Sequence, residues 1–100
     1  MGYNFHITRA ANFWESEETP IGKEEWEKIA DGTPDLVFEG HVAWNDIGMQ
    51  RIYAVSGESV NFSWRRGHVV IEGYYSDRAE RIANQLAASL GGRVQGDDED

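Results

Sequence analysis

Ser76-Asp77-Arg78-Ala79-Glu80-Arg81-Ile82-Ala83-Asn84-Gln85-Leu86-Ala87-Ala88-Ser89-Leu90-Gly91 carries the clearest periodic pattern in the chain. Its apolar side chains recur at intervals of three and four residues, which predicts one face of an amphipathic helix. Ser76 is a suitable N-cap, Asp77 favours the first turn, and Gly91 ends the helix. The alanines on this face would let the helix lie close against a sheet. The apolar positions are Ala79, Ile82, Ala83, Leu86, Ala87 and Leu90.

The residues before this helix predict antiparallel strands joined by short turns. Residues 60–64 alternate apolar and polar side chains, which is typical of a half-buried strand. Arg65-Arg66-Gly67 predicts a tight turn, because glycine adopts positive φ readily, and residues 68–72 return as the next strand. Such short connections predict an antiparallel meander. Its other segments are two apolar runs, 36–38 and 52–55, and two turns, 45–48 and 56–59.

A shorter helix is predicted to start at Gly22 and to end at Gly32. With Gly22 as N-cap, Glu25 lies at the third helical position, where its carboxylate meets free backbone N–H groups. Ile21 and Trp26 then have the spacing of a hydrophobic staple. The helix therefore has a defined start although its N-cap residue has no side chain.

The remaining segments complete the prediction of an α+β fold. Residues 3–8 alternate as a strand, residues 10–20 read as a polar connection, and residues 93–95 are a candidate last strand. We expect a mostly antiparallel sheet with both helices packed on one face, in the order β-α-β-β-β-β-α-β. The expected organisation is a single domain over residues 1–96 and an acidic tail over residues 97–100.

Charge and composition limit the classes of function. The chain has 18 acidic against nine basic side chains, a net charge of −9, and an apolar fraction of 40%, which indicates a folded domain. Such a charge repels phosphate groups, so we expect neither direct nucleic-acid binding nor membrane binding. The chain has no cysteine, which excludes zinc–thiolate sites and a cysteine nucleophile. Without a signal peptide or an apolar membrane-length segment, we expect a cytoplasmic protein.

No residue pattern predicts catalysis. The three histidines, His6, His41 and His68, lack the spacing of metal ligands, and no Ser/His/Asp set or phosphate-binding loop is evident. We therefore expect no catalytic residues, no metal and no cofactor, and we interpret the protein as a binding protein rather than an enzyme. An alternative is a small enzyme or ligand-binding domain with a polar site around His6, Arg9 and His68, if the first and fifth strands are neighbours.

A group of acids before and along the first helix predicts a binding surface for a protein with a basic surface. Two tryptophans in loop-like segments are candidate anchors beside this rim. We also expect Phe13 or its neighbour Trp14 to reach back to the core. The alternative is a solvated surface that only keeps the protein soluble. The candidate partner-binding residues are Trp14, Glu15, Glu17, Glu18, Glu24, Glu27 and Trp44.

Two stretches resemble a family of small uncharacterised bacterial proteins. Met1-Gly2-Tyr3-Asn4-Phe5-His6-Ile7-Thr8-Arg9-Ala10, followed by Glu24-Glu25-Trp26, resembles the family's opening, a Tyr-x-(Ile/Phe)-His-Ile-Thr-Arg-Ala strand and a helix with Glu-Glu-Trp. Leu90-Gly91-Gly92-Arg93-Val94-Gln95-Gly96-Asp97-Asp98 resembles its Leu-Gly-x-x-Val-Gln-Gly-Asp-Asp ending. The resemblance covers less than half of the chain, and Gly22 departs from the family's Ser or Thr. It implies no activity.

By size and acidity, the chain is similar to bacterial immunity proteins and phage-encoded inhibitors. The expected function is an inhibitor that covers a basic functional surface of a nuclease, toxin or CRISPR effector. Besides the small-molecule site described above, a structural role as a homodimer remains an alternative, with association through a sheet edge or an aromatic patch.

Overall fold

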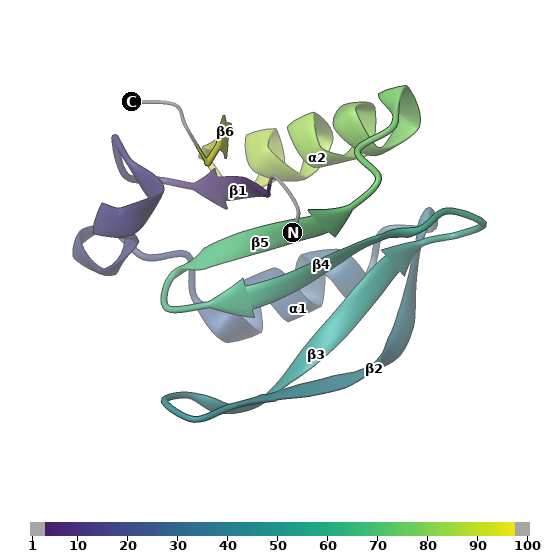
Figure 1. Cartoon of the computed structure of the whole chain (residues 1–100). Coiled ribbons are helices and arrows are strands. Elements are labelled where there is room, and N and C mark those ends of the chain that lie inside the picture. The colour runs from purple at the N-terminus through teal and green to yellow at the C-terminus, as the bar shows by residue number, and fades with distance from the viewer. Residues whose placement is uncertain (1–3, 98–100) are drawn as a thin grey trace.

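Six antiparallel strands form one sheet in the computed structural model, which describes residues 4–97 (Figure 1). The strand order across the sheet is β2-β3-β4-β5-β1-β6. The predicted α+β class and order of strands and helices are confirmed, and a 3-10 helix, η1, is added. The elements are β1 (Phe5–Thr8), η1 (Phe13–Glu18), α1 (Lys23–Asp31), β2 (Leu36–Trp44), β3 (Gly48–Val55), β4 (Val60–Arg65), β5 (His68–Gly73), α2 (Asp77–Ser89) and β6 (Arg93–Gly96).

Both helices pack on the same face of the sheet, as predicted. Trp26 of α1 and Leu86 of α2 belong to one buried cluster with Ile7, Phe62 and Val69 of the sheet. Ile7 and Val69 are register partners in β1 and β5, so their side chains point to the same face. Figure 1 shows α1 and α2 together on the far side of the sheet. This face of the sheet therefore carries the main core of the protein.

The first helix begins as its sequence predicts. Gly22 is the N-cap of α1, and its N–H donates to Glu25 Oε1 at 3.4 Å. Ile21 and Trp26, the predicted staple, are both 0% exposed. The Glu25 carboxylate also accepts a hydrogen bond from Arg9, and this bond lowers the pKa of Glu25. Arg9 is thereby held on the helix side of the sheet.

No helix within residues 4–97 is long and apolar enough to cross a membrane. The predicted strand over residues 3–8 is described from Phe5 onward, and Tyr3 lies outside the described residues. Asp97, the first residue of the predicted acidic tail, follows β6 and accepts a hydrogen bond from the Asn4 N–H at 2.8 Å. Residues 98–100 of that tail lie outside the described residues.

Two glycines with positive φ allow a matched test of the packing at the end of β5. Gly73 has φ +105, and a Cβ there would lie 2.2 Å from the Ser59 carbonyl oxygen. Gly57 has φ +81 and open space around it. We expect Gly73→Ala to lower the free energy of unfolding by about 3 kcal/mol, and Gly57→Ala by about 1 kcal/mol, since only the former adds a clash to the strain. Urea denaturation measures both values, and equal losses would contradict this packing.

Candidate functional site

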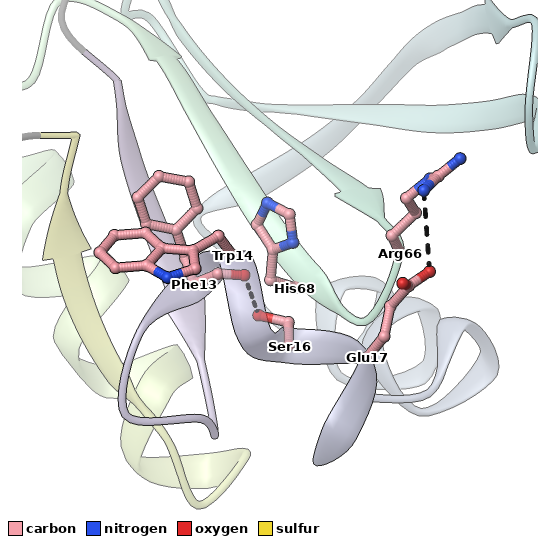
Figure 2. Close-up of a pocket in the computed structure, with 6 residues that line it drawn as sticks. All are labelled: Phe13, Trp14, Ser16, Glu17, Arg66 and His68. Atoms are coloured by element: carbon pink, nitrogen blue, oxygen red, sulfur yellow. Dashed lines mark hydrogen bonds and ion pairs between the residues drawn. The ribbon is translucent and has the colours of Figure 1, made fainter.

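A hollow of about 170 Å³ opens between η1 and the turn that joins β4 to β5 (Figure 2). It lies on the sheet face opposite the helices, because η1 contacts His6 and Thr8, which alternate with the core residue Ile7 along β1. The lining residues are Phe13, Trp14, Ser16, Glu17, Arg66 and His68.

Buried hydroxyl groups fasten η1 to β1. The Ala10 N–H donates to Thr8 Oγ1 at 3.1 Å, and the Ser16 hydroxyl donates to the Phe13 carbonyl oxygen at 2.6 Å. The two hydroxyl oxygens of Thr8 and Ser16 are 2.6 Å apart. Since the Ser16 proton is already used, Thr8 donates to Ser16. These bonds order, as a 3-10 helix, a segment whose sequence predicts only a polar connection.

A side chain from the other end of the sequence holds the start of η1. Gln95 of β6 is 0% exposed. Its Oε1 accepts from the Phe13 N–H at 2.7 Å, and its Nε2 donates to Asn12 Oδ1 at 3.2 Å. Arg93 of the same strand donates to the Ala11 carbonyl oxygen. Both ends of a buried amide are thus bonded to the segment that carries η1, which is the arrangement that burial of an amide requires.

The residues after η1 are fastened to the β4–β5 turn. Trp64 Nε1 donates to the Ile21 carbonyl oxygen at 2.7 Å, and the Ile21 N–H donates to the Gly67 carbonyl oxygen at 2.9 Å. Gly67 has φ +89, and a Cβ there would lie 2.9 Å from both Pro20 Cβ and the Ser16 carbonyl oxygen. The predicted glycine turn is therefore also the place where the segment packs most closely. With bonds before, within and after it, η1 is a fixed element.

Trp14 projects from this fixed element. It is 57% exposed, and its ring meets the Phe13 ring edge to face, with centroids 5.2 Å apart. Phe13 in turn stacks on His6, with ring centroids 3.7 Å apart and an angle of 2° between the planes. Phe13 therefore packs back on the sheet, and Trp14 remains outside. This agrees with the prediction that at least one of the two would reach back.

Three of the predicted acids belong to η1. Glu15 is half-buried and accepts a hydrogen bond from Asn12 Nδ2 at 3.2 Å. The Glu17 side chain is 69% exposed, and its Oε2 lies 3.9 Å from Arg66 Nη1. Glu18 is exposed and makes no ion pair with any of residues 4–97. These three acids thus lie on the same element as Trp14, and one of them, Glu17, lines the hollow.

The two predicted acids of α1 differ from each other. Glu24 is exposed and has no ion pair among the residues that the structure describes. The Glu27 side chain is only 18% exposed, and its Oε1 lies 3.9 Å from Arg51 Nε of β3. Arg51 also bonds Asp31 at 3.3 Å, so Glu27 belongs to a contact that ties α1 to the sheet. Of this pair, Glu24 is the one open to a partner.

The second predicted anchor, Trp44, lies outside this surface. It is half-buried at the end of β2, and the Arg65 guanidinium lies 4.2 Å from the centre of its ring. Asp46 binds both neighbouring arginines, Arg65 at 3.3 Å and Arg66 at 2.6 Å. Burial raises the pKa of Asp46, but these guanidinium groups outweigh it and hold the pKa below its ordinary value. Trp44 thus helps to brace the β2–β3 hairpin against the β4–β5 turn.

The structure brings together two of the three residues of the alternative small-molecule site. The His6 and His68 ring centroids are 5.2 Å apart across β1 and β5, while Arg9 is bonded to Glu25 on the helix side. His6 Nε2 donates to Asp97 Oδ1 at 2.6 Å. Burial by itself would raise the pKa of Asp97. The hydrogen bonds from the Asn4 N–H and from His6 lower the pKa by more than burial raises it, so it lies below its ordinary value.

Comparison with known proteins adds no relative: no protein-family model, curated protein or solved structure matches this chain. The family resemblance noted in the sequence therefore stays a prediction. Within residues 4–97, the structure groups no set of three or more histidine and acidic side chains that could hold a metal ion. The function must be inferred from the geometry of the η1 region.

Sequence reasoning named Trp14 and Glu17 but missed Phe13, Ser16 and Arg66 as members of one hollow. Only Phe13 gave a local signal, as a large apolar side chain in a polar segment. Ser16 and Arg66 are ordinary surface residue types, and nothing in their sequence neighbourhood indicates that they would face one another.

His68 supplies a pH test of the floor of the hollow. Burial, aided by the nearby charges of His6 and Arg65, lowers the pKa of His68 to about 4 from 6.5. The unfolded chain therefore binds a proton that the folded chain does not, and the free energy of unfolding should fall by on the order of 3 kcal/mol as pH drops through this window. We expect the His68 ring resonance to titrate near pH 4 by NMR, and His68→Gln to flatten the pH dependence of stability.

The exposed histidine His41 provides the control for that measurement. His41→Gln removes an imidazole from β2, which does not line the hollow, so it should leave the NMR midpoint of the His68 ring unchanged. A His68 midpoint near its ordinary value would show that the ring is solvated, and would contradict the burial of the floor.

Proposed function

We propose that this protein binds another protein through the η1 surface, which consists of Trp14, Glu15, Glu17 and Glu18 together with the adjoining hollow. The observation that carries the proposal is the 57% exposure of Trp14 on an element that is hydrogen-bonded to both β1 and β6. A surface segment that is held in one geometry by a rigid scaffold is typical of binding loops.

A fixed tryptophan is well suited to anchor a partner. Large aromatic side chains dominate the energetics of protein interfaces, and burying one removes more apolar area from water than burying any other side chain. Because η1 is already ordered, binding would not have to pay for fixing its backbone. Trp14 thus offers binding energy at little entropic cost.

The charge of the protein favours a basic partner. Several of its arginines are occupied by its own acids, as Arg51 is by Asp31 and Arg66 by Asp46, whereas Glu18 and Glu24 are exposed without such pairing in the described structure. The net charge is −9. A field of this sign accelerates encounter with a basic surface and sets orientation more than final affinity.

The class of partner that fits these features is a protein whose basic surface performs its function, such as a nuclease, a toxin or a CRISPR effector. Covering that surface would exclude its nucleic acid substrate, so the protein would act as an inhibitor of the immunity or phage counter-defence type. Support for this class comes from the charge, the exposed tryptophan and the similarity in size and acidity to such inhibitors.

The outer edge of β2 favours a second candidate, self-association as a homodimer. β2 is an edge strand of nine residues in which Val37 is 42% and Phe38 54% exposed. Unpaired edges accept another strand. However, the register shifts between Phe38 and Gly40, and such a bulge interrupts a regular ladder. Light scattering at two protein concentrations tests this candidate, since a dimer would give twice the mass of one chain.

The η1 surface can be tested by photo-crosslinking. Benzoylphenylalanine replaces Trp14 in one variant and Tyr74, which is 71% exposed on another part of the surface, in the control. In a bacterial lysate we expect an adduct from position 14 and several-fold less from position 74. Mass spectrometry should identify a basic protein, and the yield should fall as salt rises, because charge steers the encounter. Equal adducts from both positions, or a yield that ignores salt, would refute the proposal.

A further inference from the structure

We propose that the hollow between η1 and the β4–β5 turn receives an arginine side chain of the partner, with the guanidinium group between the Trp14 ring and the Glu17 carboxylate. This inference rests on the proposed function and names the chemistry that the η1 surface would recognise. It is carried by the arrangement of the lining side chains in Figure 2, where Trp14 and Glu17 lie on either side of His68.

The aromatic wall suits a planar cation. Trp14 lines the hollow, is 57% exposed, and contacts the Phe13 ring edge to face. A cation over an indole ring gains more than over any other aromatic side chain. Arginine also stacks on the ring through its flat guanidinium, which the point charge of a lysine ammonium cannot do.

The opposite wall provides a carboxylate with unused capacity. Glu17 has a single cation near it within the described chain, Arg66 Nη1 at 3.9 Å, which is beyond hydrogen-bond length. Arg66 is instead bonded through Nε to Asp46 Oδ2 at 2.6 Å. Asp46, which Arg66 shares with Arg65, thus holds the Arg66 guanidinium by its short bond, and the two Glu17 oxygens remain able to accept a bidentate pair of N–H donors.

The floor of the hollow does not oppose a cation. Burial lowers the pKa of His68 to about 4, so this ring is neutral near pH 7. The Ser16 hydroxyl is bonded within the protein, to the Phe13 carbonyl oxygen and to Thr8, and so requires nothing from a ligand. A guest can therefore interact with the walls without breaking a bond that Ser16 makes.

Charge decides between a cationic guest and an anionic one such as a nucleotide. A base could stack on Trp14, but its phosphate would enter a field set by a net charge of −9 and would meet the Glu17 carboxylate. Arg66 is the one cation in the lining, and its guanidinium already bonds Asp46 at 2.6 Å and lies 3.9 Å from Glu17, so it is only partly available to a phosphate. The same features that disfavour a nucleotide favour arginine.

The test uses N-acetylarginine amide as the probe and the indole N–H resonance of Trp14 as the reporter, in ¹H–¹⁵N NMR spectra at low salt. Trp14→Phe assigns the resonance. We expect a saturable shift with the arginine probe, a shift at least threefold weaker in apparent affinity with N-acetyllysine amide, and none with N-acetylcitrulline amide, which has the same shape without the charge. Glu17→Gln should weaken arginine binding at least threefold, and Glu80→Gln, at an exposed position of α2, should not change it.

Equal shifts from arginine and citrulline, an unchanged affinity in Glu17→Gln, or tighter binding of guanosine monophosphate would each overturn this inference. Glu17 is exposed, so its variant should keep the native spectrum, which the remaining resonances verify. A salt-dependent adduct from position 14 without arginine binding would refute the inference and leave the proposed function standing. Arginine binding without any such adduct would refute the proposed function instead.

Discussion

Ile7 and Thr8 of β1 are both 0% exposed, although adjacent side chains of a strand point to opposite faces of the sheet. A strand in this position needs cover on both sides. The helices provide it for Ile7 through the main core, and η1 provides it for Thr8 and for His6. The site therefore arises from a packing requirement, since the element that closes the second face of β1 is also the element that presents Trp14.

The cover on the second face is polar where the first is apolar. Helices of one or two 3-10 turns have little stability of their own, so η1 depends on the bonds that it makes with its surroundings. The Thr8 and Ser16 hydroxyls and the Gln95 amide supply them, and each is buried and hydrogen-bonded. Polar groups buried in this way fix one arrangement among alternatives, because any other would leave them unsatisfied. Such a segment can hold a surface tryptophan in one orientation.

Within residues 4–97, some charged side chains form ion pairs between elements of the fold, and others face the solvent without such pairs. Arg51 links β3 to α1 through Asp31, and Arg66 links the β4–β5 turn to Asp46 at the tip of the β2–β3 hairpin. Surface pairs of this kind each contribute little to stability, but they occupy the few cations that an acidic chain has. The acids around η1 are then left without close cations among the described residues, and the Arg66 guanidinium stays 3.9 Å from Glu17 Oε2. Negatively charged side chains of η1 consequently lie beside the exposed Trp14.

The amino-acid sequence by itself determined the two helices and the β4–β5 hairpin, because their causes are local: the periodicity of residues 79–90, the staple of Ile21 and Trp26, and a glycine turn. Only the tertiary structure decided the conformation of η1 and the membership of the hollow. Those depend on bonds such as that from the Phe13 N–H to Gln95, which joins residues 82 positions apart. No window of sequence contains both partners of such a bond, so its effect becomes visible only when β6 is placed beside β1.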